Sequence, residues 1–347
     1  MTTPKTCALI GTGMVAATHL AAIRDARPPV RLTGVMARTA GSARAFAAQA
    51  SLDLGHEVGI FDSITAVAAS DVDFVIIATP PDARMALVAP LARAGKAILL
   101  EKPLGRDAVE AAALVKGCAD AGVPLGVVFQ HRMRAASLAA AKLVAGGTMG
   151  APGLVEITVP WWRTQAYYDE PGRGTYARDG GGVLISQAIH TLDLALTLAG
   201  PVTHVQAMCA TTRFHQMEAE DIVSAGLRFA NGAVGSLMAS TASFPGGAET
   251  ITLHCDNASL RLDEGIARVD WRDGRADTYG ASATTGGGAD PMAFTHAWHQ
   301  AVLEDFVTAL TDNRPPAITG TDALAAHRLI DALVQSGREG RTVKMPQ

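Results

Sequence analysis

The chain has 347 residues, 48% hydrophobic and 18% charged, a composition that excludes a disordered tail and a coiled coil and predicts about two domains. Its 29 Lys and Arg residues against 33 Asp and Glu residues give a formal net charge of −4. Proteins that bind a nucleic-acid backbone are usually basic, so we expect no nucleic-acid partner. The four cysteines are widely spaced and form no C-x-x-C pair, which argues against a disulfide framework and a structural zinc site.

Two apolar stretches imitate targeting or membrane segments. The run 6–23 contains no Asp, Glu, Lys or Arg, but two glycines interrupt it, which favours a strand, a turn and a helix over a signal peptide. The segment 180–200 contains His190 and Asp193, which would be costly in a bilayer, so a buried helix explains it better. We therefore expect a cytoplasmic protein without a membrane partner.

The first third of the chain alternates short apolar runs with alanine-rich stretches, a pattern typical of a parallel sheet with crossover helices. The expected strands are 7–10, 32–36, 74–78, 97–100 and 125–129. The expected helices are 15–26, 40–50, 83–94 and 108–121. Gly95 and Gly122 stand where two of these helices should end.

The pattern changes after about residue 132. We expect a helix at 137–145, a strand at 154–160, an irregular aromatic loop, the helix that carries His190, and two final helices at 294–311 and 322–336. Strand-like segments over 202–269, joined by turn sequences such as Asn231-Gly232, predict a mostly antiparallel sheet. The stretch 280–289 predicts a mobile loop. The expected fold is therefore α/β, with a doubly wound Rossmann domain at 1–131 and an α+β domain at 132–347.

A glycine-rich turn follows the first expected strand. It reads Gly11-Thr12-Gly13-Met14-Val15-Ala16, a G-x-G-x-x-A pattern that opens a helix. Gly11 permits a tight turn, Gly13 lets the backbone approach a pyrophosphate, and the helix amides face the anion. Because the pattern stands between a strand and a helix, we predict a dinucleotide site that includes Gly11, Thr12, Gly13, Met14 and Val15.

The end of the second expected strand bears on cofactor choice. A site that prefers NAD usually places Asp or Glu there, whereas this chain has Ala37-Arg38-Thr39. Arg38 could pair with the extra phosphate of NADP. We therefore predict that NADP is preferred and NAD is the alternative, while a solvated or adenine-stacking Arg38 stays open.

A charged pair ends the expected strand 97–100. Glu101-Lys102-Pro103 stands at the carboxyl end of a buried parallel strand, where ligands of open α/β sheets bind. Proline restricts the backbone of Lys102, and Glu101 is a candidate for positioning the cofactor or the lysine. From position alone, a solvated strand end is an equal alternative.

Four motifs together resemble the glucose–fructose oxidoreductase/inositol dehydrogenase/rhizopine catabolism (Gfo/Idh/MocA) family. They are Gly11-Thr12-Gly13, Ala78-Thr79-Pro80-Pro81, Glu101-Lys102-Pro103, and Asp179-Gly180-Gly181-Gly182 followed by Gln187, His190 and Asp193. The resemblance covers nearly the whole chain. It implies a Rossmann domain, a C-terminal domain with a large open sheet, and a tightly held nicotinamide cofactor. It also implies redox chemistry on a carbon of a sugar, cyclitol or related polyol, and homodimers or homotetramers built through the C-terminal sheets.

The glycine triplet leads into the expected histidine helix. Helical spacing places Ser186, His190 and Asp193 on one face. In isolation such a histidine is more often a core residue, whereas the resemblance implies that His190 transfers a proton. Many family members carry Asp where this chain has Ser186, so the usual Lys/Asp/His triad is incomplete. Asp193 is a candidate for the missing charge, or for packing or a salt bridge.

We expect Lys102 and His190 to be the catalytic pair. In the reductive direction Lys102 donates a hydrogen bond to the developing alkoxide and His190 supplies the proton, and oxidation reverses these roles. Ser186 and Gln187 are expected to contact the substrate together with these two residues.

An aromatic segment precedes the glycine triplet. Trp161-Trp162-Arg163 and Tyr167-Tyr168 offer aromatic faces and an arginine fork that suit sugar rings and hydroxyls. We expect Trp162 and Arg163 to contact the cofactor and Tyr168 the substrate. Loop packing or a subunit contact is the alternative.

Weaker signals complete the expected site. Thr79 and Pro80 should lie beside the nicotinamide ribose, and Gln130 should contact the nicotinamide amide. The family often has Asn and His after such a proline, whereas this chain has Asp82 and Arg84, so those contacts are not carried over.

Three further histidines each have two explanations in the sequence. His19 occupies a position that the family often fills with histidine, and helix packing explains it at least as well. His296 and His299 lie one turn apart, where we favour a polar cleft edge over a metal site because no third ligand is evident.

These expectations point to an NAD(P)-dependent oxidoreductase that acts on a secondary alcohol or ketone. Two other classes stay open. One is a sensor or regulator that binds the cofactor without turnover, and the other is a glycoside-cleaving enzyme that uses bound NAD transiently.

Overall fold

The computed structural model describes residues 3–284, 287–288 and 292–345. The chain forms two compact units. Unit 1 extends to Gln130 and includes His296–Leu324, and unit 2 comprises His131–Thr295 and the chain from Ala325 onward. The first boundary lies next to the expected one at 131. The return of His296–Leu324 to unit 1 was not anticipated by a division into two consecutive parts.

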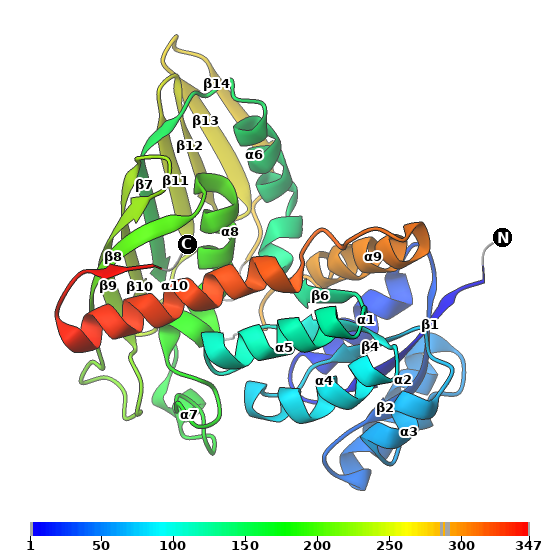
Figure 1. Ribbon diagram of the computed structural model, residues 1–347. Coiled ribbons are helices and arrows are strands. Elements are labelled where there is room, and N and C mark those ends of the chain that lie inside the picture. Colours follow the sequence, from blue (N-terminus) through cyan, green and yellow to red (C-terminus); the bar gives the residue numbers. More distant parts are fainter. Residues whose placement is uncertain (1–2, 285–286, 289–291, 346–347) are drawn as a thin grey trace. The chain divides into compact units, whose positions relative to one another are not determined.

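Unit 1 is built on a six-stranded parallel sheet in the order β3-β2-β1-β4-β5-β6 (Figure 1). Its strands are β1 (Lys5–Ile10), β2 (Val30–Met36), β3 (Gly59–Ile60), β4 (Phe74–Ile77), β5 (Ala97–Glu101) and β6 (Leu125–Val128). Every residue of β4, β5 and β6 is buried, as expected for strands that are covered on both faces. This sheet confirms the predicted Rossmann fold. The two-residue strand β3 was missed because it is exposed and has no apolar run.

Helices connect these strands. They are α1 (Ala16–Asp25), α2 (Ala40–Leu54), α3 (Ile64–Ala69), α4 (Arg84–Arg93), α5 (Ala108–Asp120) and the later α9 (Ala297–Asp312). Because parallel crossovers are right-handed, α1 and α2 lie on one face of the sheet and α3, α4 and α5 on the other. Gly95 and Gly122 follow α4 and α5 with φ values of +75° and +66°, so both are the helix ends expected from the sequence.

The segment His296–Leu324 belongs to unit 1 because α9 packs on α1. Phe306 of α9 is buried and contacts the ring of Phe74 in β4 edge to face, with centroids 5.6 Å apart. The backbone nitrogen of Val127 donates to the carbonyl oxygen of Ile318 at 3.1 Å, next to β6. A short stretch from late in the chain therefore completes both the core and one edge of unit 1.

Unit 2 contains a nine-stranded sheet in the order β14-β13-β12-β11-β7-β10-β9-β8-β15. Its strands are β7 (Pro152–Pro160), β8 (Val202–Ala210), β9 (Ile222–Phe229), β10 (Val234–Ser240), β11 (Thr250–Cys255), β12 (Ala258–Asp263), β13 (Ile266–Trp271), β14 (Ala276–Gly280) and β15 (Val343–Lys344). All described pairings are antiparallel except that of β7 with β10. The mostly antiparallel sheet predicted for this region is therefore confirmed.

The helices of unit 2 are α6 (Ala135–Ala145), α7 (Gln165–Tyr168), α8 (Ile189–Ala199) and the main part of α10 (Gly320–Glu339). α6 and α8 pack on the sheet, and Ser336 Oγ of α10 accepts from the backbone of Ala207 in β8 at 2.9 Å. Along β9, Val223, Ala225, Leu227 and Phe229 are buried, whereas Ser224, Gly226 and Arg228 between them are exposed. This alternation marks a sheet with one covered face and one open face.

Other expectations for the chain have mixed outcomes. All four cysteines are free, so no disulfide framework is present. Within the described residues, no helix combines the length and apolar character that a membrane span requires. In the expected loop 280–289, Gly280 ends β14, and residues 285–286 and 289 lie outside the described residues.

Candidate active site

The G-x-G turn of unit 1 has the backbone geometry of a phosphate-binding turn. Gly11 has a φ of +97°, and a Cβ placed on it would lie 2.7 Å from the carbonyl oxygen of Ala78, so only glycine fits. A Cβ on Gly13 would meet no described atom within 4 Å, so the backbone there is open to an approaching group. α1 follows without a side-chain cap at Val15 and without an acidic residue in its first turn. Its first N–H groups are therefore suited to an anion.

Arg38 stands at the carboxyl end of β2, immediately before α2. Thr39 caps that helix, because its Oγ1 accepts a hydrogen bond from the backbone nitrogen of Ser42 at 3.2 Å. Arg38 itself is exposed, and Ala37 before it is half-buried. An exposed guanidinium at this edge can bind a phosphate through paired hydrogen bonds, whereas a carboxylate would repel it.

Two buried oxygens mark the same edge of the sheet in unit 1. Thr79 follows β4 and Gln130 follows β6. Neither Thr79 Oγ1 nor Gln130 Oε1 has a hydrogen-bond partner among the described residues. Buried polar atoms normally find partners, and a nicotinamide dinucleotide carries ribose hydroxyls and a carboxamide that could supply them. Together with the open turn at Gly13, these atoms show that the residues of unit 1 fit such a cofactor.

Lys102 follows β5 at the carboxyl edge of the unit 1 sheet. Its side chain is half-buried, and its peptide bond to Pro103 is cis. The carboxyl ends of neighbouring parallel strands meet at one edge, so Lys102 and Thr79 stand on adjacent strand ends. An amine at this edge is in the part of the fold where substrates and cofactors of open α/β sheets bind.

Arg84 secures the two strand ends that carry Thr79 and Lys102. It is 2% exposed and opens α4. Its Nε and Nη2 donate to the carbonyl oxygen of Thr79 at 3.1 and 2.7 Å, and Nη2 also donates to that of Lys102 at 3.1 Å. Nη1 donates to the carbonyl oxygen of Glu101. Burial lowers the pKa of Arg84 to about 10, which the charge of Glu101 opposes, so the guanidinium stays protonated at neutral pH.

The carboxylate of Glu101 lies in the core of unit 1 between two histidines. Its Oε1 is 2.9 Å from Nε2 of His19 on α1 and 3.5 Å from Nε2 of His299 on α9. All three side chains are almost fully buried. Burial favours the protonated acid, but the hydrogen bonds from the histidines outweigh it and hold the pKa of Glu101 well below its ordinary value. Of the two roles expected for Glu101, this arrangement favours positioning of the lysine over cofactor contact.

The histidines differ in part from the expectations. His19 takes part in a polar cluster and is not simply a helix-packing residue. His299 is buried with it, and burial lowers its pKa, while His296 is half-buried and contacts Asp25 Oδ2 at 2.9 Å. The third possible ligand that the sequence did not reveal is Glu101. The ligand atoms of His19, Glu101 and His299 all lie within 4.8 Å of one another, a donor set that could hold a metal ion.

In unit 2, His190 lies on α8 and is 5% exposed. Its ring stacks on that of His131, with centroids 4.7 Å apart and an interplanar angle of 22°. Nδ1 of His131 is 3.7 Å from Oε1 of Glu249, which also accepts from Nη1 of Arg134 at 2.5 Å. His190 is therefore held against a second imidazole that itself lies beside a carboxylate.

Asp193 forms a salt bridge with Arg132. Nε and Nη2 of Arg132 donate to its two carboxylate oxygens at 2.6 and 2.5 Å, and Asp193 is 1% exposed. Such a two-pronged pair is geometrically specific. Of the roles considered for Asp193, the structure shows the salt bridge.

The turn before α8 explains the glycine triplet. A Cβ on Gly182 would lie 1.8 Å from the carbonyl oxygen of Glu220, so this backbone approach requires glycine. The residues Leu184–Ala188 then form a π-helical turn, and α8 begins at Ile189. The expected helix therefore exists, but Ser186 and Gln187 lie on its π-helical start.

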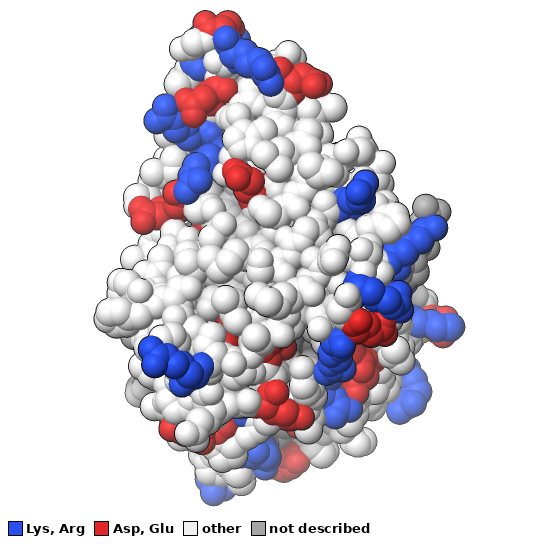
Figure 2. Space-filling view, turned by 90° about the vertical axis from the view of Figure 1, so that its left-hand side faces the viewer, with Lys and Arg blue, Asp and Glu red and all other residues white. Residues whose placement is uncertain are grey.

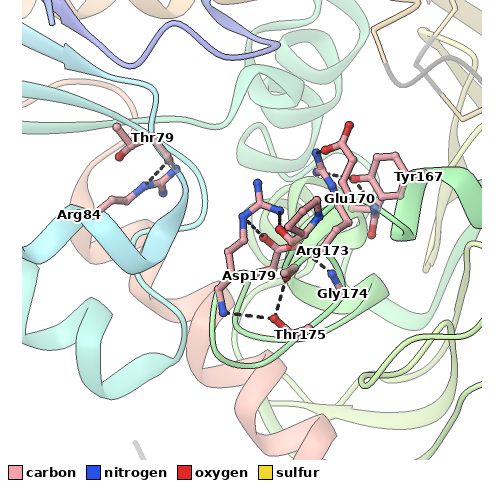
Figure 3. A network of polar contacts seen from close by, with 12 residues as sticks. Thr79, Arg84, Tyr167, Glu170, Arg173, Gly174, Thr175 and Asp179 are labelled. Atoms are coloured by element: carbon pink, nitrogen blue, oxygen red, sulfur yellow. Dashed lines mark hydrogen bonds and ion pairs between the residues drawn. The ribbon is translucent and has the colours of Figure 1, made fainter. Parts of the chain in front are cut away.

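Ser186 and Gln187 belong to a polar network of unit 2. Ser186 Oγ lies within hydrogen-bond distance of two acceptors, Gln187 Oε1 at 2.5 Å and the carbonyl oxygen of Gly182, and its single hydrogen can go to either one. Gln187 Nε2 donates to the hydroxyl oxygen of Tyr167 at 3.2 Å. Nη1 of Arg173 donates to the same oxygen at 3.0 Å and its guanidinium lies over the Tyr167 ring (Figure 3). The network brings together the hydroxyl, amide and guanidinium groups that recognise sugar hydroxyls.

The aromatic loop is braced from inside by residues expected to contact ligands. Tyr168 is 6% exposed, its hydroxyl lies 2.6 Å from Thr241 Oγ1, and burial raises its pKa. Nη1 of Arg163 donates to the carbonyl oxygens of Trp162 and Gly288 at 2.8 and 2.6 Å, and Arg163 is 2% exposed. Arg163 and Tyr168 are therefore held by contacts inside the loop. Trp162 is half-buried, and Tyr167 is a further substrate candidate beside Tyr168.

Sequence reasoning missed Arg84 and His131. Arg84 was set aside because it departs from the family pattern, and His131 was counted only as the end of a domain. An arginine in the first turn of a helix is unfavourable to the helix dipole and so was a signal of a tertiary role. No comparable local signal marks His131.

Family comparisons match both units. A profile described as an oxidoreductase family with an NAD-binding Rossmann fold matches residues 5–129, and one described as the GFO/IDH/MocA C-terminal domain matches residues 137–261. An inositol 2-dehydrogenase of Rhizobium meliloti is 28% identical, with 97% of this chain and 98% of the relative aligned. A D-apiose dehydrogenase of Paraburkholderia graminis is 30% identical, with 97% and 89% aligned.

A solved structure extends the comparison to the fold. It is the WlbA dehydrogenase from Bordetella pertussis in complex with NADH and UDP-GlcNAcA. The two chains are 27% identical and superpose with a TM-score of 0.83, over 99% of this chain and all of the other.

Proposed function

The chain belongs to the Gfo/Idh/MocA family of oxidoreductases, and from that membership we propose that it transfers hydride between a nicotinamide cofactor and a secondary alcohol or ketone of a sugar, cyclitol or related polyol. Relatives that align over nearly the whole chain are named dehydrogenases of inositol and D-apiose. The observation that carries the proposal is the carboxyl edge of the unit 1 sheet. There the open turn at Gly13, the buried oxygen of Thr79 and the amine of Lys102 stand on neighbouring strand ends.

The cofactor is a nicotinamide dinucleotide. Gly11, Thr12, Gly13, Met14 and Val15 would hold the pyrophosphate, and Ala37, Arg38 and Thr39 the adenosine ribose. Thr79, Pro80 and Gln130 would hold the nicotinamide end, with Trp162 as a further candidate. The exposed guanidinium of Arg38 supports a preference for NADP over NAD. When bound, the nicotinamide ring supplies or accepts the hydride.

Lys102 and His190 carry the proton and charge chemistry of the proposal. Lys102 donates a hydrogen bond to the oxygen of the reacting carbon, which stabilises the negative charge that develops there. His190 gives the proton to that oxygen in reduction and removes it in oxidation. His131 holds the His190 ring by stacking, and Asp193 is bound to Arg132, so His131 supports the orientation that a carboxylate supplies in many relatives.

Substrate hydroxyls are the ligands that the polar network of unit 2 fits best. Ser186, Gln187 and Tyr167 offer hydroxyl and amide groups that can both donate and accept, and Arg173 adds fixed donors. Such groups pair with the hydroxyls of a ring, whereas an apolar substrate would leave them unsatisfied. This supports a polyhydroxylated substrate.

Cofactor fluorescence tests the proposal. The purified protein is titrated separately with NADPH and NADH, and the complex is then mixed with inosones, keto-sugars and 1,5-anhydro-D-fructose. The oxidised cofactors are tested with myo-inositol, D-apiose and levoglucosan. Loss of reduced-cofactor fluorescence, or its appearance in the oxidative assay, supports the proposal and narrows the substrate.

Two results would contradict it. Tight cofactor binding with no hydride transfer to any panel member would favour the regulator. Release of an aglycone from an added aryl glycoside, without net cofactor change, would favour glycoside cleavage. The Lys102→Met variant serves as the control for both, because its cofactor binding should persist without turnover.

We propose that the open face of the unit 2 sheet forms a homodimer or homotetramer. Exposed side chains of this face include Met208, Ser224, Val234 and Ser236 on β8, β9 and β10. The face seen in Figure 2 shows a broad area without Lys, Arg, Asp or Glu, which is typical of an interface core. Light scattering checks this, and a monomer would contradict it.

We also propose that the protein works in the cytoplasm. Its four free cysteines are compatible with a reducing compartment. Fractionation of the source cells tests the compartment directly.

A further inference from the structure

Arg84 is placed where its own helix does not favour it. It opens α4, and a positive charge in the first turn of a helix is destabilising because the dipole is positive there. The side chain is also 2% exposed, so its charge has lost most of its hydration. Tertiary contacts must offset both costs.

Those contacts are three backbone carbonyl groups on two strand ends. The guanidinium donates to Thr79 after β4, and to Glu101 and Lys102 at the end of β5 (Figure 3 shows the contact with Thr79). The carbonyl groups of Glu101 and Lys102 are consecutive in the chain. One rigid fork therefore fixes the backbone of Lys102 against the strand end that carries the Thr79 hydroxyl.

We propose that Arg84 is a positioning residue that holds the backbone of Lys102 in the geometry required for hydride transfer. The inference rests on the proposed function, in which Lys102 contacts the reacting oxygen. A displacement of about 1 Å at such a group can cost about 100-fold in rate. Arg84 does not touch the reacting atoms in this proposal and acts through Lys102.

A lysine cannot replace it. The guanidinium presents donors in a planar fork, whereas an ammonium is a single point charge on a flexible stem. Arg84→Lys should therefore keep the charge but lose the simultaneous contacts with Thr79, Glu101 and Lys102. This variant separates the need for charge from the need for geometry.

The test compares Arg84→Ala with Arg93→Ala, a change of the same residue type at the exposed end of the same helix. We expect Arg84→Ala to lower kcat about 100-fold while the Kd for the cofactor changes less than about threefold, and Arg93→Ala to change neither. Added guanidinium, at a concentration far below the denaturing range, should restore at least about tenfold of the lost kcat, whereas urea at the same concentration should not. A role in stability alone would not give rescue that depends on the charged fork.

A double-mutant comparison shows whether Arg84 acts through Lys102. If Arg84 acts through Lys102, the Arg84→Ala/Lys102→Met variant turns over no more slowly than Lys102→Met alone. Three results would each overturn the proposal. The first is a folded Arg84→Ala variant with normal kcat, and the second is a double variant in which the losses of kcat from the two substitutions add fully. The third is rescue of Arg84→Ala by urea equal to that by guanidinium. If Arg84→Ala does not fold, Arg84→Lys decides, because retained kcat in that variant would overturn it and a loss of at least about tenfold would support it.

Failure of the proposed function gives a different result. If Lys102→Met keeps normal turnover, Lys102 is not the catalytic group and the proposed function fails at that point. Hydrogen–deuterium exchange of peptides covering 78–84 and 97–104 then still reports whether Arg84 fixes the two strand ends. Unchanged exchange in Arg84→Ala would show that it does not.

Discussion

Asp193 and Arg132 form a two-pronged ion pair in unit 2, in which Nε and Nη2 of the arginine lie 2.6 and 2.5 Å from the two carboxylate oxygens. Asp193 is 1% exposed and lies one turn beyond His190 on α8. The carboxylate is therefore occupied by a guanidinium. This assigns Asp193 to a salt bridge, and the ring of His131 stacks on that of His190.

Asp193→Asn should destabilise the protein by about 3–5 kcal/mol, because it leaves the charge of Arg132 without its buried partner. Urea unfolding followed by circular dichroism measures this. Asp120→Asn is the matched control, since its contact with Lys116 is exposed and should affect the midpoint little. An unfolding midpoint for Asp193→Asn equal to that of the control would contradict the structural role.

Lys102→Met should lower kcat by about 100-fold or more while the Kd for the cofactor stays within about threefold, because the amine is needed only as charge develops on the reacting oxygen. Lys116→Met, on the exposed face of α5, is the control and should behave as wild type. Stopped-flow turnover and cofactor fluorescence measure the two quantities. A rise in KM with unchanged kcat would assign Lys102 to substrate binding instead.

His190→Gln should likewise lower kcat by about 100-fold, because an amide cannot transfer the proton. His131→Phe should retain more activity than His131→Ala, since a phenyl ring preserves the stacking that holds His190. The measurement is the order of the kcat values of His190→Gln, His131→Phe and His131→Ala. Equal activity of the two His131 variants would show that stacking does not orient His190.

Features of the fold that depend on local sequence could be predicted, whereas those that depend on contacts between distant residues could not. The Rossmann sheet could be predicted because buried parallel strands are continuous apolar runs, and the turn at Gly11 is a local pattern. The return of α9 to unit 1 could not, because Phe306 meets Phe74 across a long stretch of sequence. Helix boundaries were close for the same local reasons, apart from the π-helical turn at Leu184–Ala188.

The candidate site shows the same limit. Motifs predict Lys102 and His190 as site residues. The contrast between Tyr168 and Tyr167 depends instead on distant partners, because the Tyr168 hydroxyl is buried against Thr241, 73 positions away, whereas that of Tyr167 accepts from Gln187. Local sequence could not distinguish the two tyrosines. Arg84 departs from the family pattern, so the resemblance predicted no role for it.

Arg38→Glu should reverse cofactor preference. A carboxylate after β2 repels the phosphate of NADP and can bind the ribose hydroxyls of NAD. We expect kcat/KM for NADPH to fall by about 100-fold relative to NADH, a ratio that steady-state assays give directly. Arg44→Glu on α2 is the control for charge alone. A wild-type preference for NADH would contradict the role of Arg38.

Removal of metal should leave the protein unchanged. His19, Glu101 and His299 form a possible donor set, but His19 Nε2 and Glu101 Oε1 already contact each other directly at 2.9 Å. We expect dialysis against EDTA to leave Tm, cofactor Kd and turnover at their original values, and elemental analysis to find no stoichiometric metal. One equivalent of bound zinc, lost in the His299→Gln variant, would assign a metal site to this cluster.

The same cluster should make unit 1 sensitive to acid. Burial lowers the pKa of His299 below its ordinary value of 6.5, so as the pH falls below that value the unfolded chain takes up a proton that the folded protein resists, and stability falls. The pKa of Glu101 is also lowered, so its contribution is present above the ordinary value of 4.5 and is lost as the pH falls further. Both lowered pKa values make the folded protein less stable as the pH falls, so Tm should decrease from pH 7 toward pH 4.

His299→Gln separates the two contributions, because an amide can still donate to Glu101 but does not titrate in this range. The slope of Tm against pH between about 7 and 5 should be smaller in this variant than in wild type, while the loss below about pH 4.5 should persist. His254→Gln is the matched control at an exposed position, since that imidazole is 41% exposed in its contact with Glu156. Parallel curves for wild type and His299→Gln would show that His299 titrates alike in the folded and unfolded states.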